Sequence, residues 1–181
     1  VENILKEYFA VYDTDKIAHE ILDEISEFYG YDVFTNGKID RKKLGKLVFE
    51  NCELKVKLEN LVHPKVKEKI LKIFETHKNE EMVFVSVPLL FEAGFEKLFD
   101  RIVIVTLDDE TRLKRLMNRD NLSEYEAKKR ISSQISQQEK IKKSDYIIDN
   151  NSTIDKLREQ VLVLIRELHS FIHLKDAQNK K

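Results

Sequence analysis

The sequence predicts an α/β fold in which helices cover both faces of a parallel sheet. Four short runs are continuously apolar, without the alternation of a half-exposed strand, and helical patterns separate them. Strands of this kind are typical of parallel sheets that are buried on both faces. We expect these strands at residues 9–13, 82–87, 101–107 and 145–150.

Helical spacing of apolar residues fills most of the chain between these strands. It predicts helices over residues 1–8, 16–29, 109–118, 123–143 and 153–172. Asn36-Gly37 is a turn signal within the first long interval.

Residues 41–77 form a heavily charged helical block between two strands. We interpret this block as a helical insertion into a core domain made of residues 1–40 and 78–181. Proline disfavours the helical conformation of the residue before it. We therefore expect one helix to end near His63 and another to begin at Pro64.

The composition limits the classes of function. The chain has 181 residues, and its 32 Lys and Arg nearly balance its 33 Asp and Glu. The whole molecule therefore has no general attraction to nucleic acid or to anionic membranes. The single cysteine, Cys52, excludes an internal disulfide framework. With no signal peptide and no membrane helix in the sequence, we expect a cytoplasmic globular protein.

Two carboxylates, Asp13 and Asp15, follow the first strand where a helical pattern begins. Functional groups of parallel sheets gather at this edge. Helix capping explains such a pair incompletely, because one cap needs one carboxylate. Capping does suffice for the polar residues after the later strands, which are Asp108, Asp109, Asn151 and Ser152.

Arg112, Arg115 and Arg119 recur at the spacing of one helical face, and Arg130 follows beyond a polar stretch. A solvated charged face is one explanation for these arginines. They also suit a polyphosphate, because guanidinium is always charged and bonds phosphate oxygens in pairs. Phosphoryl transfer needs such cations together with a carboxylate that accepts a proton or orients magnesium.

Six stretches in a fixed order resemble the dephospho-coenzyme A kinase family, from Val1 to about Leu168. They are YDTDKIAHEIL, NGKIDRKKLGKLVF, LENLVHPKV, VPLLFEAGFEKLFDRIVIV, RLKRLMNRDNLSEYEAKKRISSQ and SDYIIDNNS. The resemblance implies a P-loop kinase type of fold with a helical substrate-domain insertion and a helical lid at about 117–140. It implies transfer of the γ-phosphoryl group of ATP, with Mg²⁺, to the 3′-hydroxyl of dephospho-coenzyme A. This reaction is the last step of coenzyme A biosynthesis.

The resemblance also implies roles for single residues. Asp15 matches the second acid of the family's Asp-x-Asp motif, the general base for the ribose hydroxyl. Asp13 matches the first acid, which supports Mg²⁺ and the acceptor site. Arg119 matches a catalytic arginine that also contacts the ATP phosphates. The other implied acceptor-site residues are His63, Pro64, Pro88, Leu89, Leu90 and Glu92, and the other implied ATP-site residues are Arg115, Arg130 and Asn150.

Three positions of the lid and the core refine the resemblance. Gln134, with Arg130, matches the returning helix of the lid. Ser86 stands where the family often has an acid, and Arg112 stands where it often has glutamine.

The family opens with a strand and a glycine-rich loop that ends in Gly-Lys-Ser/Thr, and this sequence contains neither. Its first residues, VENILKEY, resemble the helix that follows that loop. Without the central strand, neighbouring buried strands would lack a backbone partner. We therefore expect the intact polypeptide to carry the loop.

Two other functions stay open at this point. One is another small-molecule kinase of the same fold, although LVHPKV followed by VPLLFE argues against it. The other is a degenerate, non-catalytic member that binds coenzyme A-like ligands, which rests only on the missing loop.

Overall fold

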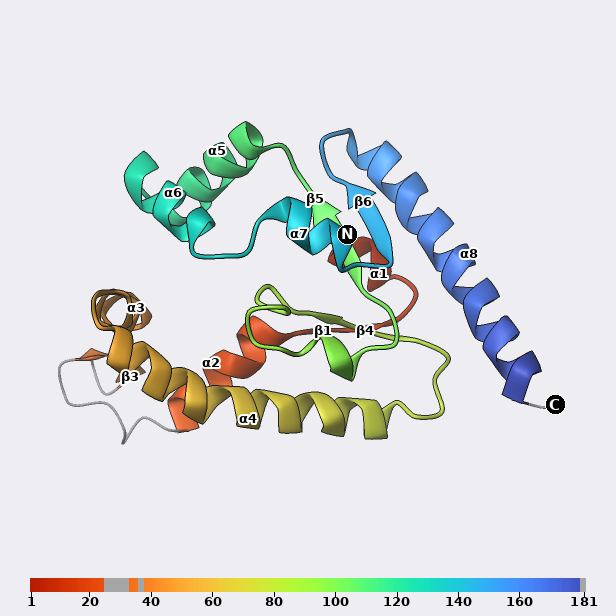
Figure 1. The fold of residues 1–181 in the computed structure, drawn as a ribbon, viewed down its shortest axis with the longest axis horizontal. Coiled ribbons are helices and arrows are strands. Elements are labelled where there is room, and N and C mark those ends of the chain that lie inside the picture. Colours follow the sequence, from red (N-terminus) through yellow and green to blue (C-terminus); the bar gives the residue numbers. More distant parts are fainter. Residues whose placement is uncertain (25–32, 36–37, 180–181) are drawn as a thin grey trace. The chain divides into compact units, whose positions relative to one another are not determined.

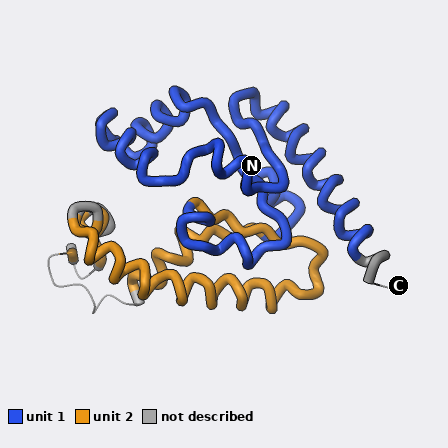
Figure 2. The backbone as a smooth tube through the Cα atoms, viewed as in Figure 1, with its two compact units in different colours: residues 1–10, 89–181 blue, residues 11–88 orange. Residues whose placement is uncertain are grey.

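The computed structural model describes residues 1–24, 33–35 and 38–179, and Figure 1 shows their helices and strands. The chain forms two compact units (Figure 2). Unit 1 contains residues 1–10 and 89–181, and unit 2 contains residues 11–88. The predicted division into a core domain of residues 1–40 and 78–181 and a helical insertion of residues 41–77 stays a prediction.

Two of the predicted strands pair with each other in unit 2. They are β1 (Ala10–Asp13) and β4 (Val83–Ser86). Directly after β1, α2 (Thr14–Glu24) begins and packs against α4 (Cys52–Thr76). The residues that these two helices bury recur every three to four positions, as expected for one apolar helix face. They are Ile17 and Ile21 of α2 and Val62, Val66 and Ile70 of α4.

A second apolar cluster in unit 2 lies around α3 (Arg41–Glu50) and a short antiparallel hairpin. The hairpin consists of β2 (Phe34–Thr35) and β3 (Lys38–Ile39). Val33 and Leu44 are buried at the centre of this cluster. The expected turn at Asn36-Gly37 and the end of the expected helix at 25–29 lie outside the described residues.

The predicted helix break at His63-Pro64 is wrong, because α4 continues through Pro64. An interior proline costs about 3 kcal/mol of helix stability. Tertiary packing opposes this cost, since α4 buries side chains on both sides of the proline. The break lies instead at Asn51, whose side chain accepts the Leu54 N–H at 3.0 Å and caps α4.

In unit 1, β5 (Val103–Thr106) and β6 (Tyr146–Asp149) form a parallel pair, in register from Val103–Tyr146 to Thr106–Asp149. α8 (Ile154–Asn179) packs against β6 and against α1 (Glu2–Leu5). A short 3-10 helix, η3 (Glu96–Leu98), precedes β5. The buried face of α8 carries Leu157, Val161, Leu164, Ile165 and Leu168.

The predicted helix over 123–143 is also wrong, because the structure divides it into two. They are α6 (Glu124–Ser132) and α7 (Gln137–Lys142), which follow α5 (Asp109–Asp120). Ser136 and Glu139 form a capping box that starts α7, just as Ser123 and Glu126 start α6. The Ser-x-x-Glu spacing at 136–139 was the sequence signal for this break.

The predicted α/β fold class is confirmed by this alternation of helices with short, partly parallel strands. Within the described ranges, no helix is both long enough and apolar enough to span a membrane.

Candidate active site

The strand-to-helix junction of unit 2 carries the two predicted carboxylates. Asp13 ends β1, and Asp15 is the second residue of α2. The Asp13 Oδ1 atom accepts the backbone N–H of Asp15 at 2.9 Å. Asp13 therefore caps α2 by satisfying an N–H group that has no partner within the helix. Capping accounts for one carboxylate only, and the exposed Asp15 side chain lies beyond that cap.

Hydrogen bonds from neighbouring side chains hold the same junction in place. The buried Thr14 hydroxyl donates to the backbone oxygen of Ser86 at 3.0 Å, which joins the start of α2 to the end of β4. The Tyr12 hydroxyl lies 2.6 Å from His77 Nε2, at the end of α4. The other ring nitrogen, His77 Nδ1, lies 2.7 Å from Glu80. These contacts fix the backbone on both sides of Asp13.

Three predicted acceptor-site residues also belong to unit 2. His63, which is half-buried, and Pro64, which is exposed, lie in the middle of α4. Pro88 is exposed just after β4, at the last position of the unit.

The predicted acceptor-loop residues of unit 1 lie in a tight turn after Pro88. The backbone oxygens of Leu89 and Leu90 accept the N–H groups of Ala93 and Phe95, each at 2.9 Å. Gly94 has a φ of 68°, a left-handed conformation that a side chain rarely adopts, and it lets the chain reverse here. Leu89, at the start of this turn, is 45% exposed. Because the resemblance predicts that residues of this turn bind the acceptor, we call residues 89–95 the acceptor loop.

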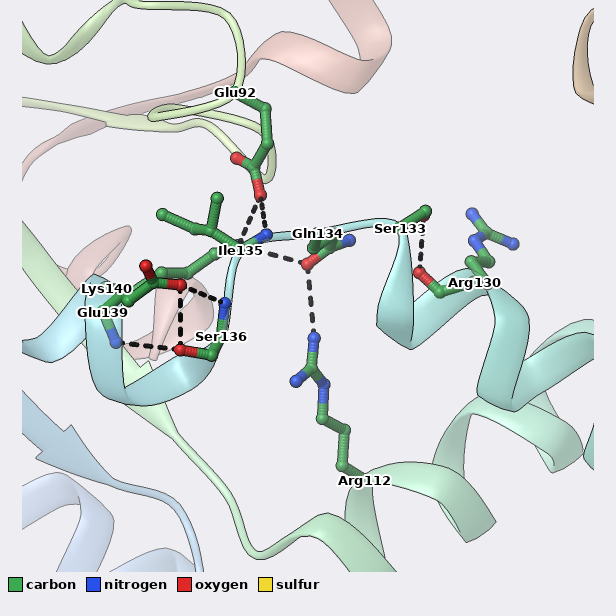
Figure 3. A network of polar contacts seen from close by, with 9 residues as sticks. All are labelled: Glu92, Arg112, Arg130, Ser133, Gln134, Ile135, Ser136, Glu139 and Lys140. Carbon is green, nitrogen blue, oxygen red and sulfur yellow. Dashed lines mark hydrogen bonds and ion pairs between the residues drawn. The ribbon is translucent and has the colours of Figure 1, made fainter.

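Glu92 of this loop contacts the segment that joins α6 to α7 (Figure 3). Its Oε1 atom accepts the backbone N–H of Ile135 at 3.0 Å and lies 3.3 Å from Lys140 Nζ. Lys140 also donates to Gln134 Oε1 at 3.1 Å, and Arg112 Nη2 donates to the same oxygen at 3.2 Å. The sequence pattern did not predict Lys140 as a partner of Glu92, because the two residues lie far apart along the chain.

Two of the predicted phosphate-binding arginines share one carboxylate. Arg119 donates from Nε and Nη2 to the two oxygens of Asp120 at 2.7 and 2.9 Å. Arg130 Nη1 donates to Asp120 Oδ2 at 2.7 Å. The Arg119 hydrogen bond, together with the charges of both arginines, lowers the pKa of Asp120. The Asp120 side chain is 23% exposed, whereas those of Arg119 and Arg130 are 69% and 55% exposed.

The cations of this cluster therefore face solvent, and the acid lies beneath them. Planar guanidinium groups held by a carboxylate keep a fixed orientation. Arg115 is exposed on α5, the helix that also carries Arg119.

Asn150 continues the parallel strand pair, because its backbone N–H donates to Thr106 O at 2.9 Å. The predicted cap at Asp108 is confirmed: its Oδ1 accepts the Thr111 N–H at 2.8 Å, which lowers the pKa of Asp108. The predicted cap of α8 at Asn151 or Ser152 is wrong. α8 begins at Ile154, and the Thr153 hydroxyl oxygen accepts the Lys156 N–H.

No group of three or more potential metal ligands among His, Cys, Asp and Glu occurs in the part of the chain that the structure describes. The described residues thus offer single carboxylates, not a protein cage for a metal ion. Mg²⁺ that is carried by a nucleotide needs only one or two protein carboxylates, because phosphates and water supply its other ligands.

Comparisons with known proteins agree on one family. The family model for dephospho-CoA kinase matches residues 3–156. A dephospho-CoA kinase of Listeria monocytogenes is 44% identical over 149 residues, which are 81% of this chain and 74% of that protein. The one of Fusobacterium nucleatum is 42% identical over 160 residues, which are 84% of this chain and 82% of that protein.

Solved structures agree with these relatives. The dephospho-CoA kinase of Campylobacter jejuni superposes with a TM-score of 0.67 at 39% identity, covering 92% of this chain and 88% of that one. A Thermus thermophilus protein superposes with a TM-score of 0.75 at 28% identity, covering 91% of this chain and 87% of that one. The family that the sequence predicted is confirmed. This chain belongs to the dephospho-CoA kinase family, and it is a kinase.

Proposed function

We propose that this protein transfers the γ-phosphoryl group of ATP to the 3′-hydroxyl of dephospho-coenzyme A. The observation that carries the proposal is the match of the dephospho-CoA kinase family model across both compact units. The described side chains provide the two kinds of group that the reaction needs. They are carboxylates at a strand end and exposed arginines on helices.

In this proposal Asp15 is the general base. Its carboxylate accepts the proton of the ribose 3′-hydroxyl as that oxygen attacks the γ-phosphorus of ATP. The position suits the role, because Asp13 already caps α2 and the Asp15 side chain is exposed to an incoming substrate. The contacts of Thr14 and Tyr12 preorganise the backbone that carries this base.

Asp13 is the proposed protein carboxylate for Mg²⁺ that arrives with ATP. Its Oδ1 atom accepts the Asp15 N–H, so the cap also fixes the orientation of the carboxylate. A single oriented carboxylate fits a metal whose remaining ligands are phosphates and water.

Arg119 is the proposed catalytic arginine, and Arg115 and Arg130 are proposed to bind the ATP phosphates. Two of these three guanidinium groups are oriented by Asp120 and exposed to solvent. Fixed cations of this kind neutralise charge that develops on the transferring phosphoryl group. Asn150 is proposed to lie near the adenine.

The remaining assignments concern the acceptor and its surroundings. We assign dephospho-coenzyme A to the helical insertion at 41–77 and to the acceptor loop, and the lid to about 117–140. The proposed contacts are His63, Pro64, Pro88, Leu89 and Leu90. The proposed location is the cytoplasm, since Cys52 is the only cysteine and is exposed as a thiol.

The proposal is tested with full-length protein whose N-terminus has been verified. It is incubated with Mg²⁺, ATP and dephospho-coenzyme A, and coenzyme A is measured by mass spectrometry. We expect coenzyme A and ADP in equal amounts. Phosphorylation of a different metabolite, with no coenzyme A formed, would show that the substrate is wrong. Binding of dephospho-coenzyme A without any phosphoryl transfer would favour the non-catalytic alternative.

A further inference from the structure

Glu92 and Lys140 form an ion pair that is mostly shielded from water. Only 19% of the Glu92 side chain and 13% of the Lys140 side chain are exposed. Most other ion pairs of the described residues have side chains that are more than a third exposed. Removing one partner of a shielded pair leaves an uncompensated charge, so such a pair responds strongly to substitution.

The pair belongs to a network that joins three separate parts of unit 1 (Figure 3). The Gln134 side-chain oxygen accepts from Arg112 on α5 and from Lys140 on α7. Glu92 adds the acceptor loop through Lys140 and through the Ile135 N–H. The helix that enters the lid, the segment that leaves it and the acceptor loop therefore meet at one point.

The segment that leaves the lid has the features of a hinge. Residues 133–136 lie between α6 and α7 and are not helical. The Ile135 N–H is thus not used within a helix, and its acceptor is the carboxylate of Glu92. The capping box of Ser136 and Glu139 fixes the following turn at the start of α7. The hydrogen bond from the Ile135 N–H to Glu92 therefore holds the chain just after the C-terminal end of α6, and this limits the motion of α6.

We propose that Glu92, Gln134 and Lys140 form a hinge anchor that couples occupancy of the acceptor loop to the position of the lid. The resemblance places Glu92 among the acceptor-site residues. In this proposal it acts through the hinge as a positioning residue, because its carboxylate is held by the Ile135 N–H and by Lys140. A substrate that orders residues 89–95 also orders the Glu92 carboxylate, and this restrains the Ile135 backbone and α6, which carries Arg130. The inference rests on the proposed function, because it assigns the acceptor to this loop.

The test compares Lys140→Met with Lys142→Met by hydrogen exchange. Methionine keeps the length of the lysine stem and removes its donors. Lys142 lies two residues further along α7 and is exposed, so it controls for the loss of a positive charge. Without ligand, we expect exchange of α6 and residues 133–136 to become roughly tenfold faster in Lys140→Met, because charged hydrogen bonds stabilise local structure. We expect Lys142→Met to exchange like the wild type.

The second measurement adds dephospho-coenzyme A alone, without ATP. In the wild type and in Lys142→Met, we expect it to slow exchange in α6. In Lys140→Met this slowing should be lost, while the acceptor KM changes less than kcat. Glu92→Gln keeps an acceptor for the Ile135 N–H and removes the charge, so it should lose only part of the slowing and provides a milder variant if Lys140→Met unfolds.

Retention of the full slowing in Lys140→Met and Glu92→Gln would overturn the coupling. An equal loss in Lys142→Met would overturn it too, because the effect would then be one of net charge. If dephospho-coenzyme A does not bind to the wild type, the proposed function fails. The comparison without ligand still tests whether Lys140 anchors the hinge.

Discussion

The two compact units hold their candidate functional groups in different ways. In unit 2, Asp13 and Asp15 lie at a strand-to-helix junction, and the contacts that fix them involve backbone atoms at Asp15 and Ser86. In unit 1, Arg119 and Arg130 lie on exposed helices, and the contact that fixes them is the side chain of Asp120. The proposed base is thus positioned by backbone contacts of the fold. The proposed cations, Arg119 and Arg130, are positioned by the carboxylate of Asp120, which both of them contact.

This difference has a chemical reason. A general base must meet a single proton with sub-ångström accuracy, which a backbone junction provides. Phosphate oxygens are diffuse charges that move during closure and transfer, so cations on long side chains serve them well. We therefore expect a single substitution at the unit 2 junction to change either kcat or stability. We expect a single substitution in the arginine cluster of unit 1 to change the two together more often.

The largest effect is expected for Asp15→Asn. The amide has the same shape but cannot accept the ribose proton, so kcat should fall roughly 10²- to 10⁴-fold. The KM values should change little. The melting temperature should stay near that of the wild type, because Asp13 provides the cap of α2. Steady-state kinetics and thermal melts on the purified variant measure these quantities.

Asp13→Ala is the matched control for structure at the same junction. It removes the cap, so it should cost about 1 kcal/mol of unfolding free energy and should destabilise the protein more than Asp15→Ala does. A near-normal kcat in Asp15→Asn would end its assignment as the base. Equal destabilisation by Asp13→Ala and Asp15→Ala would show that the backbone does not hold the pair as described.

The next effect is expected for Arg119→Ala. Loss of one preorganised donor to a developing negative charge typically lowers kcat roughly 10²- to 10³-fold. The KM for ATP should rise by a smaller factor, because Arg119 acts mainly on the phosphoryl group in transit. Lys114→Ala, an exposed lysine on the same helix, is the control and should leave both parameters near wild type.

A larger rise in KM than fall in kcat would contradict this role and leave Arg119 as a binding residue only. In that case unit 2 would supply the catalytic group and unit 1 would supply affinity for ATP. The two units would then differ in the function that they serve, not in whether backbone or side-chain contacts position their groups.

The sequence predicted the strands well and the helix boundaries less well. Continuous apolar runs identified β1, β4, β5 and β6, because such runs are typical of strands in a helix-covered sheet. Burial on both faces was not confirmed, since Val105 of β5 and Ile147 of β6 are 43% and 54% exposed. Pro64 misled the prediction for α4, since the apolar face of that helix is satisfied only by tertiary packing. Ser136 was missed although its capping box is a local signal.

For the site, short-range geometry was readable and long-range partners were not. The sequence already indicated that Asp13 and Asp15 supply one carboxylate more than a helix cap needs. The structure identifies Asp13 as the cap, because its Oδ1 atom accepts the Asp15 N–H. The partnership of Asp120 with Arg130 spans ten residues and depends on how α5 meets α6. The ion pair of Glu92 with Lys140 depends on how the acceptor loop meets the segment between α6 and α7. No periodicity or spacing in one sequence encodes such contacts.

The smallest effect concerns the titration of Asp120. The Arg119 hydrogen bond and the charges of Arg119 and Arg130 lower its pKa in the folded state, below the value of about 3.9 for a free aspartate. The folded state therefore binds this proton less readily than the unfolded state. The stabilisation by the cluster is present above about pH 4 and is lost as the pH falls through the lowered pKa. Because the arginines are exposed, the contribution should be at most about 1 kcal/mol and should weaken with salt.

The Arg119 Nε–H signal in NMR spectra reports this titration directly, since that group donates to Asp120. Its shift should change with a midpoint below about pH 3.9, and the step should be absent in Asp120→Asn. In that variant Arg119 and Arg130 lose the charge that orients them, so kcat should fall a few-fold while the fold is retained. A midpoint at or above the ordinary aspartate value would show that the arginines are not held by Asp120 in solution. The cations of unit 1 would then owe their orientation to the bound phosphate, and the contrast with the backbone-held carboxylates of unit 2 would become sharper.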